Sequence, residues 1–112
     1  MAIERNLQIN QGASFTFKVY YTVDDMPVDF TDWDGRMYLK ANFQDTSPAL
    51  ALTTDNGGLV WQDGAILVSM TPAQTADLAN QYYYDLVMTN EAGTEAYRLI
   101  YGRAIISPEV SR

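Results

Sequence analysis

Short stretches in which apolar and polar residues alternate recur along the chain, and turn-forming residues separate them. Successive side chains of a β-strand point to opposite faces, so this period of two indicates strands with one face on a core and the other in solvent. The clearest stretch covers residues 14–22, where Phe15, Phe17, Val19 and Tyr21 share one face. The pattern predicts an all-β fold.

A second alternating stretch covers residues 36–43. Turn chemistry at residues 24–27 precedes it, since Asp side chains bond to nearby backbone and Pro27 has a fixed φ angle. We therefore predict that this stretch pairs with the first. Its predicted inward residues are Met37, Leu39, Ala41 and Phe43, and its predicted outward residues are Arg36, Tyr38, Lys40 and Asn42.

Shorter apolar runs follow, and the Asp63-Gly64 pair between two of them accepts the positive φ angles of a tight hairpin turn. Residues 82–88 and 97–106 are predicted to form the closing hairpin. An isolated glycine inside a strand marks a bulge or a close backbone approach, so we expect the side-chain alternation to slip at Gly102.

Only residues 71–79 depart from the β pattern. Thr71-Pro72-Ala73-Gln74 matches a capping box with proline at the first helical position, which predicts one or two helical turns. A helix this short suits a connector that crosses from one sheet to another. The stretch from Asp77 to Tyr82 resembles the tyrosine corner of immunoglobulin-like domains.

Together these elements predict a two-sheet antiparallel immunoglobulin-like β-sandwich with one short helical turn. A chain of 112 residues suits one core, so residues 1–112 are predicted to be a single domain. Residues 1–10 and 107–112 are expected to be extended terminal arms that contact neighbouring subunits.

The sequence has no histidine and no cysteine, which removes the usual general base, thiol nucleophile and zinc ligands. We therefore expect no enzymatic activity, no catalytic residues, no metal site and no cofactor. Carboxylates do cluster between residues 24 and 34, where a calcium site or a pair of hydrolytic acids is the alternative to a solvated loop. They are Asp24, Asp25, Asp29, Asp32 and Asp34.

Acidic residues outnumber basic ones by 14 to 7, giving a net charge of -7, and the cations are scattered along the sequence. Affinity for nucleic acid comes mostly from clustered Lys and Arg, so no nucleic acid partner is expected. No apolar run reaches the roughly 20 residues that span a bilayer, and the polar start does not match a secretory signal. We therefore expect no membrane association.

Eight tyrosines and two tryptophans provide large contact surfaces. Phe15, Phe17, Tyr84 and Leu86 are predicted to be core residues. The candidate contacts with other proteins lie in the terminal segments and on outward positions of the predicted strands. They are Ile3, Leu7, Tyr20, Trp33, Tyr38, Tyr83, Pro108, Val110 and Arg112.

Several short motifs, in this order along the chain, resemble the immunoglobulin-like N-terminal domain of phage baseplate upper proteins and related small virion proteins of tailed phages. They are Gln11-Gly12-Ala13-Ser14-Phe15, Val28-Asp29-Phe30-Thr31-Asp32-Trp33, Asp63-Gly64, Tyr84-Asp85-Leu86, Gly93, Gly102 and Ser107-Pro108-Glu109-Val110-Ser111-Arg112. Phe30, Asp32 and Ser111 depart from the common pattern of Leu, Gly and Thr.

The resemblance implies a non-enzymatic structural part of a bacteriophage virion, assembled in the host bacterial cytoplasm and present in several symmetric copies. Its partners would be other virion proteins of the tail, baseplate, fibre or capsid. The leading interpretation is a tail, baseplate or fibre-linking adaptor that acts through protein–protein contacts. A capsid decoration (cement) protein is one alternative, and a carbohydrate-binding module that uses Trp33 and Trp61 is another.

Overall fold

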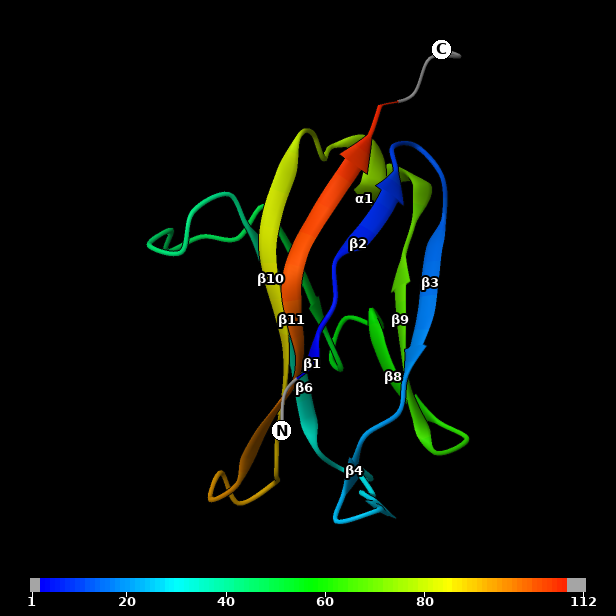
Figure 1. Ribbon diagram of the computed structural model, residues 1–112, viewed down its shortest axis with the longest axis vertical. Helices are drawn as coiled ribbons and strands as arrows, with labels where there is room; N and C mark the ends of the chain where they lie inside the picture. Colours follow the sequence, from blue (N-terminus) through cyan, green and yellow to red (C-terminus); the bar gives the residue numbers. More distant parts are fainter. Residues whose placement is uncertain (1–2, 109–112) are drawn as a thin grey trace.

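A computed structural model describes residues 3–108, which form eleven strands and one five-residue helix (Figure 1). The strands belong to a six-stranded sheet, a three-stranded sheet and a two-stranded hairpin, which confirms the all-β prediction. In chain order the elements are β1 (Ile3–Glu4), β2 (Leu7–Asn10), β3 (Phe15–Val19), β4 (Thr22–Val23), β5 (Met26–Pro27), β6 (Asp34–Lys40), β7 (Leu50–Thr53), β8 (Leu59–Gln62), β9 (Ala65–Met70), α1 (Pro72–Ala76), β10 (Gln81–Thr89) and β11 (Ala96–Ser107).

The six-stranded sheet has the order β1-β11-β10-β6-β7, and β2 also pairs with β11. Its neighbours are antiparallel except β1 and β2, which both run parallel to β11. Residues 3–10 are therefore part of the sheet, and the prediction that they form an extended arm is wrong. Of the predicted C-terminal arm, residues 109–112 lie outside the described residues.

The β6 strand pairs with β10 and β7, and the prediction that it pairs with the first long strand is wrong. The turn at Asp24 and Asp25, both with positive φ, closes a small hairpin of β4 with β5 instead. One further hydrogen bond extends this hairpin past Pro27, from the Val28 N–H to the Tyr21 carbonyl at 3.1 Å, and the chain then crosses to the six-stranded sheet before β6 begins.

The three-stranded sheet has the order β3-β9-β8. Asp63 and Gly64 join β8 to β9 with φ angles of 53° and 79°, and Gln62 pairs with Ala65 across the turn. This is the predicted two-residue hairpin, since both central residues of such a turn need positive φ.

The helix α1 begins at the predicted capping box. The Thr71 hydroxyl accepts a hydrogen bond from the Gln74 N–H at 3.2 Å, and the Gln74 side chain accepts one from the Thr71 N–H at 2.8 Å. The helix ends at Ala76, three residues earlier than predicted. It connects β9 of the three-stranded sheet to β10 of the six-stranded sheet, which confirms the predicted crossover.

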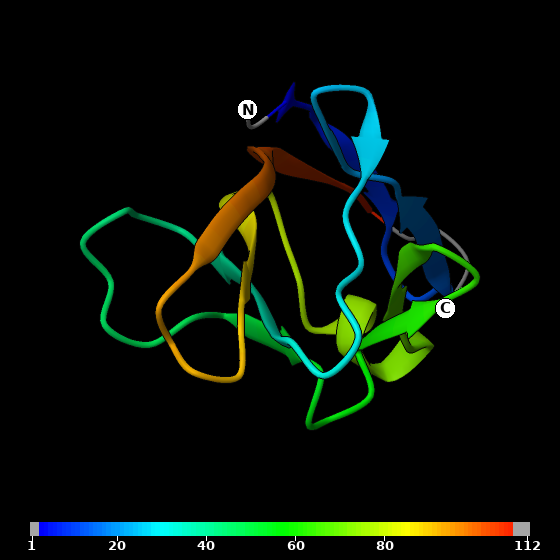
Figure 2. The ribbon, with the colours of Figure 1, turned by 90° about the horizontal axis from the view of Figure 1, so that it is seen from below.

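Buried side chains from the six-stranded and three-stranded sheets form one hydrophobic cluster. Seen along the long axis, β6, β10 and β11 lie on one side of the molecule and β3, β8 and β9 on the other (Figure 2). Tyr84 and Leu86 are buried as predicted, and Phe15 and Phe17 pack against the cluster half-buried. Phe43 is 74% exposed, because β6 ends three residues before it.

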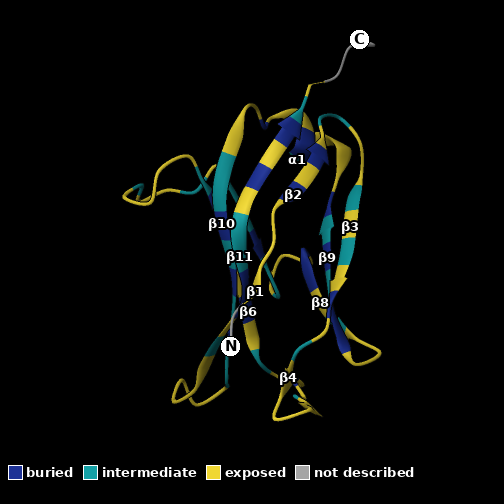
Figure 3. Cartoon of the chain, viewed as in Figure 1, coloured by how far each residue is buried: buried dark blue, intermediate teal, exposed yellow. Residues whose placement is uncertain are grey.

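Ala41 is exposed for the same reason, so the prediction that residues 41 and 43 face inward is wrong. The alternation itself is visible along β11 and β2, where buried and exposed bands follow one another (Figure 3).

The alternation along β11 slips at Leu99 rather than at Gly102. Val87 of β10 lies opposite Arg98, whereas Leu86 lies opposite Ile100, so Leu99 is the extra residue of a bulge. Leu99 and Ile100 are consequently both buried. The predicted slip at Gly102 is therefore misplaced by three residues, and the alternation continues through that glycine.

Gly102 instead permits a close backbone approach, which is the second structural role that an isolated glycine in a strand can have. A Cβ atom there would overlap the carbonyl oxygen of Arg5, at the point where the N-terminal segment passes from β1 to β2. The Arg5 N–H donates to the Tyr101 carbonyl at 2.8 Å, and the Arg103 N–H donates to the Asn6 side chain at 3.1 Å. These bonds hold the two residues between β1 and β2, Arg5 and Asn6, against β11.

Candidate functional site

Three strands of the six-stranded sheet present a regular set of side chains on the surface that faces away from the core. Register places these residues in three rows across β6, β10 and β11, and we call the nine of them the outer face. The rows are Lys40–Tyr83–Arg103, Tyr38–Asp85–Tyr101 and Arg36–Val87–Arg98. The bulge at Leu99 is what places Arg98 on the same face as Tyr101 and Arg103.

A cation occupies each corner of this face, and the single carboxylate, Asp85, lies at its centre. Adjacent strands are about 4.8 Å apart and each residue advances about 3.3 Å. The four cations therefore frame an area of about 10 by 13 Å. Tyrosine and valine side chains occupy the positions between the corners.

The contacts within the outer face leave most of its positive charge unpaired. Arg98 lies 3.4 Å from the Asp85 carboxylate and also stacks over the Tyr101 ring, with its guanidinium carbon 4.1 Å from the ring centre. Among residues 3–108 this is the only ion pair. Arg36, Lys40 and Arg103 thus have no carboxylate partner within the described chain, although acidic residues outnumber basic ones.

A depression of about 340 Å³ lies over the part of the outer face nearest β6. Phe43, from the loop that follows β6, forms one wall and stacks on Tyr83 with 4.2 Å between ring centres. Sites for small ligands are mostly apolar concavities, whereas Arg and Lys side chains line much of this one. Arg and Tyr are the residue types enriched where proteins bind one another.

The structure brings together two of the sequence-predicted contact residues, Tyr38 and Tyr83, which lie on neighbouring strands of the outer face. Three more are exposed elsewhere, on β1, between β3 and β4, and just after β11. They are Ile3 at 61% exposure, Tyr20 at 65%, and Pro108. Val110 and Arg112 lie outside the described residues.

The structure contradicts one predicted contact residue, Leu7, and leaves another, Trp33, partly accessible. Leu7 faces the core from β2 and is 4% exposed, because it lies opposite Ala104 on the inner face of the sheet. Trp33 is half-buried in an aromatic cluster at one end of the core. Its ring stacks on Tyr97 with 5.7 Å between ring centres and meets the ring of Phe30 at 5.0 Å.

This aromatic cluster also includes Trp61, whose ring lies 5.6 Å from that of the buried Phe30. Stacking on a sugar needs a free ring face. Because Trp33 and Trp61 both use their rings to close the end of the core, the cluster has a structural role that accounts for them.

The aspartates between residues 24 and 34 do not converge. Within residues 3–108, no three acidic side chains come together in a way that suits a metal ion. Asp29 accepts hydrogen bonds from the hydroxyl and N–H of Thr31, at 2.5 and 2.9 Å, and these bonds lower the pKa of its carboxyl group. Asp24 and Asp25 form the tip of the β4–β5 hairpin.

Sequence reasoning missed Arg36, Lys40, Asp85, Arg98 and Arg103 as members of a site. It did predict that Arg36, Tyr38 and Lys40 share an outward face. The missing information was the pairing of β6 with β10 and the position of the bulge, which together join cations that are up to 67 residues apart in sequence.

The one helix of the described residues, α1, is not long and apolar enough to cross a bilayer. In comparisons with known proteins, neither a family model nor a curated protein matches the sequence.

Proposed function

We propose that this chain is an immunoglobulin-like β-sandwich that acts as a non-enzymatic, protein-binding structural part of a tailed-phage virion. Its place in the virion would be in the tail, in the baseplate or at the link to the fibres. The observation that carries the protein-binding role is the outer face, on which cations and tyrosines from three strands form one surface directed away from the core.

Two observations support the immunoglobulin-like assignment. The N-terminal strands run parallel to the last strand while the other pairs of the six-stranded sheet are antiparallel, and a short helix carries the chain between sheets. In addition, the Ala79 N–H donates to the Tyr82 hydroxyl at 3.1 Å. A tyrosine at this corner that bonds to backbone a few residues upstream is typical of the fold.

The phage assignment rests on the resemblance of ordered short motifs, and the structure gives some of them a physical role. Asp63-Gly64 forms a tight turn, Gly102 permits the close approach of Arg5, and Tyr84 donates a hydrogen bond to the Arg5 carbonyl at 2.5 Å. Gly102 and Tyr84 hold the N-terminal segment on the six-stranded sheet. A domain stabilised in this way suits a rigid linking part.

Mass spectrometry of purified virions tests this proposal. We expect peptides of this chain in intact particles at a copy number on the order of ten, as the rotational symmetry of a tail requires. Absence of the chain from purified particles would overturn the virion assignment. Hundreds of copies per particle would replace the tail or baseplate position with capsid decoration.

A further inference from the structure

The β4–β5 hairpin combines negative charge with exposed apolar surface. Its tip consists of Asp24 and Asp25, and Val23 and Met26 beside them are 38% and 68% exposed. In the described chain β4 and β5 pair with no other strand. Exposed apolar side chains next to two carboxylates form a surface that suits a partner with both cations and aromatic rings.

The outer face offers cations and rings, and its central carboxylate, Asp85, is already paired with Arg98. Arg36, Lys40 and Arg103 lack a carboxylate partner in the described chain, and the depression between β6 and β10 includes the ring surfaces of Tyr38 and Phe43. A two-stranded hairpin has strands about 4.8 Å apart, so its tip is narrower than the spacing of about 10 by 13 Å between the corner cations. Charge, apolar character and size are therefore complementary.

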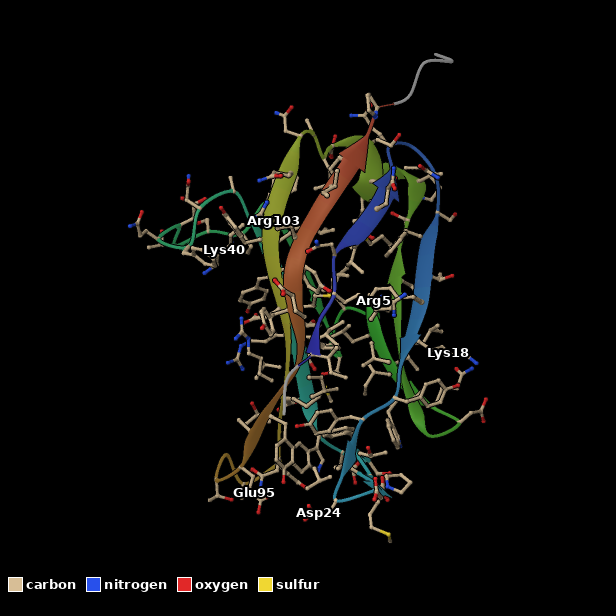
Figure 4. The ribbon with its side chains drawn as sticks, in the orientation of Figure 1. Arg5, Lys18, Asp24, Lys40, Glu95 and Arg103 are labelled. Carbon is tan, nitrogen blue, oxygen red and sulfur yellow. The ribbon has the colours of Figure 1, made fainter. Side chains whose placement is uncertain are left out.

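The two surfaces lie apart on the same molecule. Figure 4 shows Lys40 and Arg103 along the sheet and Asp24 near one end of the long axis, where Glu95 also lies. One copy can therefore use both surfaces at once, each with a different neighbour. Such a heterologous contact generates a ring when the rotation closes and a filament when it does not.

We infer that the outer face of one copy binds the β4–β5 hairpin of a second copy, head to tail. The inference deepens the proposed function and rests on it, since it specifies how copies of a virion part would join. Each copy has a net charge of -7, but at physiological ionic strength repulsion beyond about 8 Å is screened. The local pairing of Asp24 and Asp25 with the corner cations then dominates.

Two variants of the full chain test the contact. The face variant carries Arg36→Gln, Lys40→Gln and Arg103→Gln. The hairpin variant carries Asp24→Asn, Asp25→Asn and Met26→Ser, because asparagine tolerates the positive φ of both tip positions. Sedimentation equilibrium at about 0.15 M salt measures association of each variant alone and of their equimolar mixture.

We expect the unmodified chain to form species larger than a dimer as its concentration rises. Each variant alone should associate at least about tenfold more weakly. The mixture should form a dimer with one copy of each and nothing larger, because the face variant retains its hairpin and the hairpin variant retains its face. Restored dimerisation of two separately inactive variants is specific to a head-to-tail contact.

Matched controls are available for both variants. Lys18→Gln removes a cation from the exposed side of β3, and Asp63→Asn changes an aspartate that also has a positive φ in the β8–β9 turn. Both should associate like the unmodified chain. Far-ultraviolet circular dichroism verifies folding. If the face variant does not fold, Arg103→Gln alone replaces it, and if the hairpin variant does not fold, Met26→Ser alone replaces it.

A monomeric unmodified chain, a mixture that stays monomeric, or equal weakening by Lys18→Gln would each overturn the head-to-tail contact. None of these results bears on the presence of the chain in virions, so the inference and the proposed function fail independently.

Discussion

The two faces of β6, β10 and β11 differ sharply although the same three strands form both. Met37, Leu39 and Leu86 on the inner face are fully buried, whereas their sequence neighbours on the outer face are exposed or half-buried and mostly charged or aromatic. The inner face determines the register, because a slip by one residue would move its apolar side chains into solvent. We therefore expect the outer face to contribute less to stability than the inner face, which would leave its residues available for binding.

Leu86 and Val87 are adjacent in β10 and point to opposite faces, which makes them the sharpest test of this difference. Leu86→Ala leaves a cavity in the core and should lower the free energy of unfolding by about 2–5 kcal/mol. Val87→Ala on the outer face should cost about 1 kcal/mol or less. Urea denaturation measures both, and equal losses would show that the two faces do not differ in their contribution to stability.

Gly102 and Gly64 both have positive φ but differ in their surroundings. At Gly64 no atom lies within 4 Å of an added Cβ, whereas at Gly102 the Cβ would overlap the Arg5 carbonyl. Gly102→Ala should therefore cost about 3 kcal/mol, since its φ region is essentially restricted to glycine. Gly64→Ala should cost about 1 kcal/mol.

Thermal and urea denaturation compare the two glycine variants. A loss at Gly102→Ala no larger than that at Gly64→Ala would mean that the N-terminal segment does not need to lie close to β11.

Tyr84 points inward from β10, and its hydroxyl donates to the same Arg5 carbonyl. Burial raises its pKa from 10.0 to about 12, with Arg5 opposing the shift. The unfolded chain therefore loses this proton at lower pH than the folded chain. The contribution of the Tyr84 hydroxyl to the free energy of unfolding is fully present below pH 10 and declines as pH rises from 10 towards 12.

Tyr84→Phe should cost about 1 kcal/mol near neutral pH through the lost hydrogen bond. It should also remove the Tyr84 contribution to the decline above pH 10. Urea denaturation at several pH values tests both, with Tyr101→Phe on the outer face as the control. An unchanged alkaline decline in the Tyr84 variant would contradict the assignment.

The parts of the fold that sequence predicted correctly depend on local chemistry. The Asp63-Gly64 turn, the capping box at Thr71 and the alternation of β3 all follow from residues that are neighbours in the chain. Each needs only local backbone preferences, which a single sequence contains.

The parts that it did not predict depend on contacts between distant residues. The sequence predicts an extended terminal arm over residues 1–10, yet Gly102 lets residues 3–10 pair with β11. The outer face depends on the same kind of information, because pairing of β6 with β10 and an extra residue at Leu99 bring its cations together. Turn chemistry at residues 24–27 even suggested the wrong partner for β6.

The smallest expected effects on stability are those of the outer-face cations themselves. Lys40→Gln removes a charge with no carboxylate partner, so it should change the free energy of unfolding by no more than about 0.5 kcal/mol. Arg98→Gln removes both the ion pair with Asp85 and the contact with the Tyr101 ring. Both side chains of that pair are nearly half exposed, which screens the interaction, so the loss should be about 0.5–1 kcal/mol.

Salt separates these two variants, because screening weakens exposed ion pairs. The difference between Arg98→Gln and Lys40→Gln should shrink when urea denaturation is repeated in about 1 M salt. If Lys40→Gln instead destabilised the fold as much as Arg98→Gln, the corner cations would be structural, and the outer face would be no freer to bind a partner than the inner face.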